Sequence, residues 1–367
     1  MLTLSSPVAV TVTLFVSLAL AHALVLSAHK HGHLTMDVPG AVQKFHLDPT
    51  PRVGGIAIYI AVAAAWMLMP GLAEAKLLST ILVAGMPALF VGLWEDVTKR
   101  VSVRTRLLVT MASGGLACVL TGVALNRVDI PVAELVLTWW PLAVIFTAFA
   151  VGGIANAINI IDGFHGLASG TVIISMLSLA GIAFSVGDVP LATVAVVMAA
   201  ALAGFWLVNF PWGKLFLGDG GAYFSGFALA WLCVELLARN SGVSPWAAVL
   251  ICGYPTIEVM YSVYRRRMQR RSPGEADRHH LHSLVATQLV HPRLPNLPPN
   301  LRNAAVSVVM WICAVTPVVP AVLFPSRPDV LIPALLVCVV GYHLFYRRVA
   351  SLTPATDIDE AQSTARV

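Results

Sequence analysis

Charged residues are scarce in this chain of 367 residues: Asp, Glu, Lys and Arg together make up 11% of it, whereas soluble domains carry about 25%. Hydrophobic residues make up 58%, and the mean hydropathy is +0.82. No stretch is polar and long enough to form a separate soluble domain. The composition therefore excludes an ordinary soluble protein and predicts a protein embedded in a lipid bilayer.

Three further features are missing, and each excludes a class of protein or site. The five cysteines stand singly inside or at the ends of apolar segments, without metal-site spacing, so we interpret them as packing residues. No Lys or Arg precedes the first apolar segment, which favours a retained helix over a cleaved signal peptide. The basic residues flank apolar segments without interleaved aromatic residues, so anionic lipid is a better partner than nucleic acid.

Apolar segments long enough to cross about 30 Å of hydrocarbon recur along almost the whole chain. The expected fold is all-α, a polytopic transmembrane helix bundle formed by a single domain over residues 1–350. The polar residues 351–367 are expected to form a disordered cytoplasmic tail. We expect eleven membrane-crossing helices, at residues 7–27, 53–70, 77–94, 107–125, 135–152, 167–187, 190–209, 221–238, 246–264, 304–324 and 330–346.

The positive charges predict the orientation of the bundle, because cytoplasmic loops retain Lys and Arg. With the N-terminus outside and eleven crossings, 19 of the 23 Lys and Arg residues fall on the cytoplasmic side. The sequence therefore predicts an N-out, C-in topology, with cytoplasmic loops at residues 28–52, 95–106, 153–166, 210–220 and 265–303.

Ionisable residues are costly near a membrane, and here they concentrate in the five loops that are expected to face inward. The first loop combines Lys44, His46 and Arg52 with a Pro-Thr-Pro sequence that favours an extended backbone. These cations either contact a phosphate or lipid headgroup, or only flank the following helix.

The second inward loop begins with two adjacent acids, Glu95 and Asp96, which are followed by Lys99. Adjacent carboxylates repel each other unless a cation lies close to them. The pair indicates either a hard divalent cation, or a base with its partner, or simply a solvated helix end.

The third and fourth inward loops carry isolated polar residues in apolar surroundings. Asn156, Asn159 and Asp162 are spaced three apart, which on a helix gives one polar face that must look into the bundle or a wet cleft. Asp219 lies in a Gly-Asp-Gly-Gly turn at the start of the eighth expected helix, with Asn209 nearby. A ligand site is one interpretation of both loops, and capping of the following helices is the other.

The fifth inward loop is the longest, and it combines a run of arginines with several histidines. A run of arginines from Arg265 to Arg271 is typical of a topological anchor, and His280 and His282 follow it. Their imidazoles can bind a diphosphate or leaving group near neutral pH, whereas zinc binding is disfavoured because no cysteine is near.

Taken in order, the five loops resemble those of the polyprenyl-phosphate N-acetylhexosamine-1-phosphate transferases, which include the peptidoglycan lipid translocase and the enzymes that start O-antigen and enterobacterial common antigen. That family carries a K-x-H-x-x-P-T-P-R-x-G-G loop, an Asp-Asp pair, an N-x-x-N-x-x-D-G-x-x-G-L segment, an F-x-G-D-x-G turn and an H-x-H motif. The resemblance covers residues 37 to 284, and the matching positions are Lys44 to Gly55, Asp96, Asn156 to Leu167, Phe216 to Gly221, His280 and His282.

The chain departs from the family pattern at three positions. Glu95 replaces the first Asp of the pair, Gln43 stands where an Arg often precedes the Lys, and Ser283 stands where a third His is common. The negative charge at the acidic pair is kept. These changes affect the expected sugar nucleotide and the role of Glu95, and not the reaction class.

The resemblance implies an enzyme of the bacterial inner (cytoplasmic) membrane that faces the cytoplasm. Its lipid substrate, a polyprenyl (undecaprenyl) phosphate, would attack the β-phosphorus of a UDP-sugar and release UMP, directly or through a phospho-carboxylate. The product would start a lipid-linked cell-envelope glycan such as O-antigen. Whether the chain forms a homodimer is left open.

The resemblance also implies roles for the loop residues, with Mg²⁺ as the cofactor and Mn²⁺ as its alternative. Asp219 would be the principal metal ligand together with Asp162, while Glu95 and Asp96 would complete the catalytic group and Asp96 could act as a base. The residues expected to bind substrate are Lys44, His46, Arg52, Lys99, Asn156, Asn159, Asn209, His280 and His282.

Two other functions are compatible with some of these features. A secondary transporter for an anionic or phosphorylated solute would place its binding groups near the midplane, between internal repeats. The sequence has no obvious repeat, and its carboxylates lie at one membrane boundary. A membrane phosphatase would release inorganic phosphate without any UDP-sugar.

Overall fold

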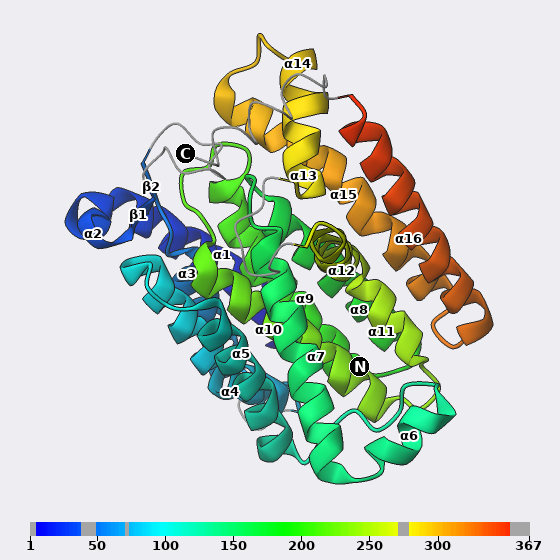
Figure 1. The fold of residues 1–367 in the computed structure, drawn as a ribbon. Helices are drawn as coiled ribbons and strands as arrows, with labels where there is room; N and C mark the ends of the chain where they lie inside the picture. Colours follow the sequence, from blue (N-terminus) through cyan, green and yellow to red (C-terminus); the bar gives the residue numbers. More distant parts are fainter. Residues whose placement is uncertain (1–4, 38–48, 70–72, 271–278, 353–367) are drawn as a thin grey trace.

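The computed structural model describes residues 5–37, 49–69, 73–270 and 279–352. Figure 1 shows an elongated bundle of helices with one two-residue strand pair, β1 (Met36–Asp37) and β2 (Thr50–Pro51). The helices are α1 (Ser5–Leu26), α2 (Ala28–Thr35), α3 (Gly54–Met67), α4 (Ala73–Thr98), α5 (Val103–Thr121), α6 (Pro131–Leu137), α7 (Trp140–Ile160), α8 (Leu167–Ser185), α9 (Val189–Asn209), α10 (Gly218–Arg239), α11 (Pro245–Ile251), α12 (Gly253–Met268), α13 (Leu281–Leu284), the π-helix η1 (Val285–Val290), α14 (His291–Arg293), α15 (Pro299–Leu323) and α16 (Pro328–Ala350).

The expected all-α class and the polytopic bundle are confirmed. Within the described residues, nine helices are long and apolar enough to cross a membrane. The bent pair α11–α12 passes the same test as a unit, and α3 is a shorter apolar helix of 14 residues. Each of the eleven expected segments coincides with one of these elements, while the number of actual crossings stays a prediction.

Helix α10 forms the centre of the bundle. It is apolar around its whole circumference, and nearly all of its residues are buried, including Tyr223, Phe227 and Trp231. A helix that is hydrophobic on every side is stable only when other helices surround it. Helices α3, α4, α7 and α8 all pack on α10, so the residues at its N-terminus lie where several helix ends meet.

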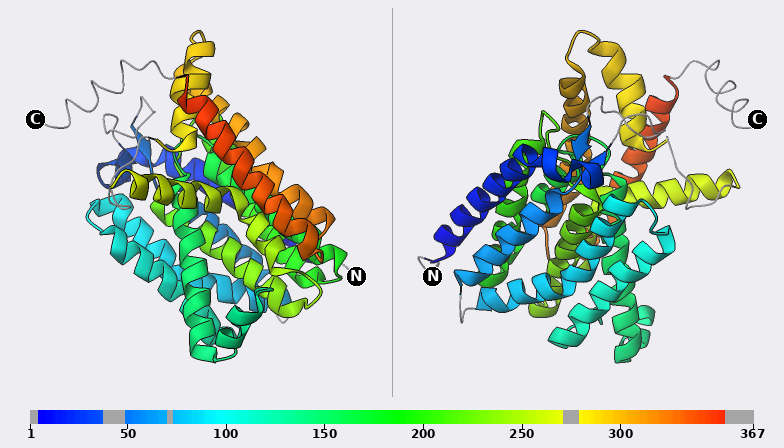
Figure 2. Two further views of the ribbon diagram at one scale, coloured as in Figure 1. Left: turned by 45° about the vertical axis from the view of Figure 1, so that its right-hand side comes forward. Right: turned by 90° about the vertical axis from the view of Figure 1, so that its left-hand side faces the viewer.

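The segment expected as one helix at 246–264 is instead broken, which corrects the prediction. Helices α11 and α12 meet at Cys252 and are bent by 78°. Pro255 lacks the N–H that would bond one turn back, and Gly253 packs so closely on Pro317 that a Cβ there would lie 2.7 Å from it. Figure 2 shows α12 projecting sideways from the bundle.

Two of the expected loops also contain regular structure. The 28–52 loop holds α2 and the β1–β2 pair, and the 265–303 loop holds α13, η1, α14 and the first turns of α15. The periodicity of hydrophobic residues does not reveal such short elements, because each contains only one or two turns. Lys44 and His46, and most of the expected tail at 351–367, lie outside the described residues.

The loops separate into two groups at opposite ends of the bundle, as the sequence predicts. At one end, Arg127 donates a hydrogen bond to the carbonyl of Ser241 at 2.7 Å, and Ser244 donates one to Asp129 at 2.6 Å. Asp188 accepts two hydrogen bonds from Arg239, both at 2.7 Å. These contacts join the loops expected outside, and the acidic loops meet at the other end.

Candidate functional site

The backbone at the C-terminal end of the first inward loop is joined to the fourth. The carbonyl of Pro51 accepts a hydrogen bond from the Phe216 amide at 2.9 Å, and the Gly54 and Gly55 amides donate to the carbonyls of Phe216 and Leu217 at 3.0 and 3.1 Å. Three consecutive backbone bonds therefore fix the start of α3 beside the turn that carries Asp219.

Glycines let the backbones of α3 and α4 touch the first turn of α10. A Cβ at Gly92 of α4 would lie 2.3 Å from the Gly220 amide nitrogen, and one at Gly55 of α3 would lie 2.5 Å from Gly221 Cα. No side chain fits in either place, so only glycine permits this approach. The approach brings the last turn of α4, with its acidic pair, to the N-terminus of α10.

Asp96 caps the N-terminus of α10 from a different helix. Its Oδ1 accepts a hydrogen bond from the Asp219 amide at 2.9 Å, and its Oδ2 accepts one from the Gly220 amide at 3.0 Å. Asp96 is 1% exposed. The first amides of a helix lack partners within the helix and carry partial positive charge, so a carboxylate satisfies them well. Both oxygens of Asp96 are thereby used in positioning Asp219, a role that the sequence does not reveal.

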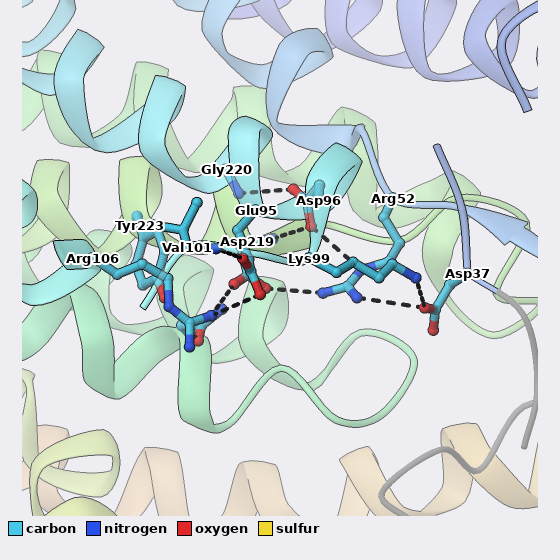
Figure 3. A network of polar contacts seen from close by, with 11 residues as sticks. Asp37, Arg52, Glu95, Asp96, Lys99, Val101, Arg106, Asp219, Gly220 and Tyr223 are labelled. Atoms are coloured by element: carbon cyan, nitrogen blue, oxygen red, sulfur yellow. Dashed lines mark hydrogen bonds and ion pairs between the residues drawn. The ribbon is translucent and has the colours of Figure 1, made fainter. Parts of the chain in front are cut away.

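The Asp219 carboxylate lies between two arginines (Figure 3). Arg52 donates to its Oδ1 and Arg106 to its Oδ2, each at 2.9 Å. Arg106 also lies 3.5 Å from Glu95 Oε1, while Glu95 Oε2 accepts a hydrogen bond from the Val101 amide at 2.8 Å. The acidic pair and the Asp219 turn, about 120 residues apart in the chain, thus form one network.

Asp37 extends the network to the edge of the site. The β1–β2 pair sets Asp37 opposite Thr50, which lies two residues before Arg52 in the chain. Its Oδ1 lies 3.4 Å from Arg52 Nη1 and 3.3 Å from Lys99 Nζ. The cations expected from the sequence, Arg52 and Lys99, are thus brought together by an acid to which the sequence analysis gave no role.

The polar residues of the third loop face other helices of the bundle, as expected. Asn156 donates to Thr110 Oγ1 of α5 at 2.8 Å, and Asn159 Oδ1 accepts a hydrogen bond from the Tyr223 hydroxyl of α10 at 3.3 Å. Asn156 and Asn159 lie in the last two turns of α7, and Asp162 lies in the turn that follows. The side-chain amides of Asn156 and Asn159 therefore connect the end of α7 to α5 and α10.

Asn209 joins the third loop to the fourth. Its Oδ1 accepts a hydrogen bond from the Gly166 amide at 2.5 Å, and its Nδ2 donates to the Leu215 carbonyl at 2.7 Å. Asn209 is buried, with a residue exposure of 5%. These backbone contacts give Asn209 a role in positioning the two loops, while its expected contact with substrate stays a prediction.

The histidines of the fifth loop lie against the third. The rings of His280 and His282 stack with centroids 5.3 Å apart, and His282 meets the edge of the Phe164 ring at 5.6 Å. A Cβ at Gly163 would lie 3.2 Å from His282 Nε2. The H-x-H motif therefore adjoins the turn that carries Asp162.

Known proteins share this sequence pattern. Residues 78–237 match the family model described as glycosyl transferase family 4. The chain is 30% identical over 257 residues to a Bacillus subtilis (strain 168) protein named as a probable undecaprenyl-phosphate N-acetylglucosaminyl 1-phosphate transferase, covering 68% of this chain and 69% of that protein. The chain belongs to glycosyl transferase family 4, in the group of polyprenyl-phosphate hexosamine-1-phosphate transferases.

Other members of glycosyl transferase family 4 are similar at comparable levels. A decaprenyl-phosphate N-acetylglucosaminephosphotransferase of Mycolicibacterium smegmatis is 30% identical over 306 residues, which cover 73% of this chain and 70% of that protein. The undecaprenyl-phosphate alpha-N-acetylglucosaminyl 1-phosphate transferase of Salmonella typhi is 28% identical over 250 residues, which cover 66% of this chain and 67% of that protein.

The negative charges and carboxylate oxygens of the network around Asp219 suit a divalent cation. Burial first, and then the negative charges of Asp219 and Asp96, raise the pKa of Asp162 to about 7, against the opposing effect of Arg52. The ionised Asp162 carboxylate is therefore unfavourable in its buried position, and a hard cation with oxygen ligands would stabilise it. Among the described residues, and when all are ionised, the site has five carboxylates and three cations, namely Asp37, Glu95, Asp96, Asp162 and Asp219 with Arg52, Lys99 and Arg106.

The geometry differs from that of a preformed metal site. In the part of the chain that the structure describes, no three His, Cys, Asp or Glu side chains gather around one point as metal ligands do. The two arginines bound to Asp219 occupy the hydrogen-bonding positions of that carboxylate. The residues therefore fit Mg²⁺ by charge and donor chemistry, but a metal at Asp219 would require the two arginines to exchange partners.

Four residues of the site carry contacts that the sequence analysis did not assign: Asp37, Arg106, Tyr223 and Glu258. Arg106 was counted only as a positive charge, although it stands one turn inside α5, facing the acidic pair. Tyr223 follows Asp219 by four residues, which places both on one face of α10. That spacing is a signal that could have identified Tyr223.

Proposed function

We propose that this protein transfers N-acetylglucosamine 1-phosphate from UDP-N-acetylglucosamine to a polyprenyl phosphate and releases UMP, which would start a lipid-linked cell-envelope glycan. Membership of the family supports the sugar-1-phosphate transfer to polyprenyl phosphate. The names of the related proteins described above support N-acetylglucosamine as the sugar.

The observation that carries this proposal is the Asp219 turn, which Asp96 fixes by two backbone hydrogen bonds and which Arg52 and Arg106 flank. A lipid phosphate and a nucleotide diphosphate repel each other. A catalyst must therefore neutralise their charges and align them, while the phosphoryl group needs little other help from the protein. Alternating carboxylates and guanidinium groups, held rigidly at one end of the bundle, suit both tasks.

Asp219 and Asp162 would hold Mg²⁺, which supplies charge neutralisation on the diphosphate when it is bound. Arg52 and Arg106 would then transfer hydrogen bonds from Asp219 to phosphate oxygens, because a guanidinium group binds either anion with the same fork of N–H donors. Lys99, which is half-exposed at the edge of the network, would attract the lipid phosphate.

The bonding of Asp96 disfavours this residue as the nucleophile of a phospho-carboxylate intermediate, and we propose direct attack by the lipid phosphate. Both of its oxygens already accept backbone hydrogen bonds, so it would have to uncap α10 to act as a nucleophile. In direct attack, an oxygen of the lipid phosphate bonds to the β-phosphorus as the bond from that phosphorus to the bridging oxygen breaks. UMP leaves with that oxygen and the electron pair of the broken bond.

We also propose that this end of the bundle faces the bacterial cytoplasm and that the topology is N-out, C-in. The positions of the Lys and Arg residues support it. In intact cells, a cysteine introduced at 239–245 should react with an impermeant thiol reagent, and one introduced at 279–303 should not. The reverse labelling pattern would contradict the orientation.

The activity is tested with purified protein in detergent, undecaprenyl phosphate, Mg²⁺ and a panel of UDP-sugars, with lipid products identified by mass spectrometry. The proposal predicts an undecaprenyl-diphospho-N-acetylglucosamine product and one UMP per lipid formed. A product from a different UDP-sugar would correct the assigned sugar. Release of inorganic phosphate without any sugar lipid would indicate a phosphatase.

A further inference from the structure

Glu258 of α12 is a completely buried acid outside the acidic network around Asp219. It is 0% exposed, and each of its carboxylate oxygens has a protein partner. Oε1 lies 3.0 Å from His280 Nδ1 and 3.3 Å from the Leu281 amide, and Oε2 accepts a hydrogen bond from the Tyr342 hydroxyl at 2.6 Å. Burying a carboxylate is costly unless several donors compensate it, so this arrangement demands an explanation.

The helices α12 and α16 together enclose the histidine segment. Ser262, one turn after Glu258, has its hydroxyl 3.2 Å from His280 Nδ1. From α16, the Tyr346 hydroxyl donates to the His279 carbonyl at 3.0 Å. The backbone and one ring nitrogen of the H-x-H motif are thus held by side chains from two helices, α12 before it and α16 after it in the sequence.

Ring contacts connect His280 to the turn that carries Asp162. The rings of His280 and His282 are nearly parallel, with an angle of 7° between their planes, and His282 in turn contacts Phe164. A tilt of the first ring would therefore displace the second. Glu258 stands at the end of a continuous chain of contacts that leads to the third loop.

We propose that Glu258 is a positioning residue for the transfer reaction. Its carboxylate fixes the direction of the His280 ring through Nδ1, so that the histidine pair binds the anionic nucleotide. A carboxylate that orients a functional imidazole is a recurring arrangement in enzymes. The inference rests on the proposed function, because it assigns the nucleotide as the group that the histidines bind.

Tyr342 extends this role to the last helix of the bundle. The family model ends at residue 237, and α16 begins at Pro328, so similarity over the matched segment gives no role to this helix. Its tyrosine orients the Glu258 carboxylate from the side opposite to His280. Helix α16 therefore takes part in building the nucleotide site in addition to packing.

The test is a double-mutant cycle on kcat/KM for the UDP-sugar, with Glu258→Gln, His280→Ala and the double variant. Glu258→Gln keeps the shape and loses the charge, and it should lower kcat/KM by about 10- to 100-fold, as is usual when a residue that orients a functional imidazole is changed. The double variant should be within about threefold of His280→Ala alone, because both changes disable the same group. UMP affinity, measured by calorimetry on the same proteins, should fall in parallel.

Two controls keep the result interpretable. Glu235→Gln changes another buried acid, on α10 near the opposite end of the bundle, and should leave kcat/KM within about twofold. Tyr342→Phe removes one hydrogen bond with little change of shape and should lower kcat/KM about fivefold, which corresponds to one net hydrogen bond. It serves as the test if Glu258→Gln does not fold.

The inference is overturned if Glu258→Gln has wild-type kcat/KM, or if the losses of Glu258→Gln and His280→Ala multiply in the double variant. Multiplied losses would mean that Glu258 acts on the fold and not through His280. Wild-type protein that binds UMP but makes no sugar lipid would instead contradict the proposed function. The UMP affinities of the variants would still test the role of Glu258 in that case.

Discussion

Replacing Asp96 by Asn tests whether this acid organises the site or acts as a chemical base. Its two oxygens accept hydrogen bonds from the Asp219 and Gly220 amides. The amide oxygen of Asn can accept one of them, but its NH₂ group would then face the other N–H donor. The charged pairing with Arg52, at 3.4 Å from Oδ1, is lost as well.

The stability cost follows from these contacts. Losing one charge-assisted hydrogen bond and leaving a buried donor unsatisfied costs about 1.5–3 kcal/mol. For a chain of this size, we expect a fall in Tm of about 2–5 °C. The start of α10 should also shift, which moves Asp219, so transfer activity should fall by at least about 100-fold.

Thermal denaturation in detergent and the transfer assay are measured on the same preparations. The adjacent Glu95→Gln is the control for stability, because an amide oxygen can still accept the hydrogen bond from the Val101 amide, and its Tm should stay within about 1 °C of wild type. If Asp96→Asn abolishes activity with an unchanged Tm, the capping role is wrong and Asp96 acts in the chemistry itself.

Three further predictions concern single carboxylates. Asp219→Asn should abolish transfer while the protein stays folded in the membrane, because the amide keeps the shape and loses the charge that attracts Mg²⁺; near-normal activity would refute the assignment. Glu95→Gln should lower kcat by more than about 100-fold and Glu95→Asp should keep part of the activity, whereas activity of Glu95→Gln within about twofold would leave the catalytic role to the other acids. Hydrogen bonds from Arg239 and Asn240 outweigh burial and hold the pKa of Asp188 below its usual range. The stabilisation is present above the ordinary aspartate pKa of about 3.9 and is lost as the pH falls through the lowered value. Asp188→Asn should therefore lower Tm at pH 7, with a difference from wild type that shrinks below about pH 4; a difference independent of pH would contradict this.

The sequence predicted the site where each loop carried its own signal. The Asn156, Asn159 and Asp162 spacing, the Gly-Asp-Gly-Gly turn and the acidic pair all stand out because polar groups are rare in an apolar chain. The structure places these residues together at one end of the bundle, while the number of membrane crossings stays a prediction.

The partners of these residues could not be predicted, because they depend on three-dimensional contacts between distant segments. Arg106 looks like any positive charge after a membrane helix, and Glu258 lies in what reads as an ordinary amphipathic helix end. The bend at Cys252 was hidden because hydropathy continues across it, although Gly253 and Pro255 were visible. The capping of α10 by Asp96 requires the backbone approach at Gly92, which only the packed structure reveals.

The central claim is that the β-phosphorus of the nucleotide moves to the lipid together with the sugar. UDP-N-acetylglucosamine labelled with ³²P at the β-position tests it directly, when incubated with the purified protein, undecaprenyl phosphate and Mg²⁺. The account predicts that all label consumed appears in the lipid fraction and that the released nucleotide is unlabelled UMP. Label released as UDP would mean transfer of the sugar alone, and label released as inorganic phosphate would mean hydrolysis; either result would contradict the account.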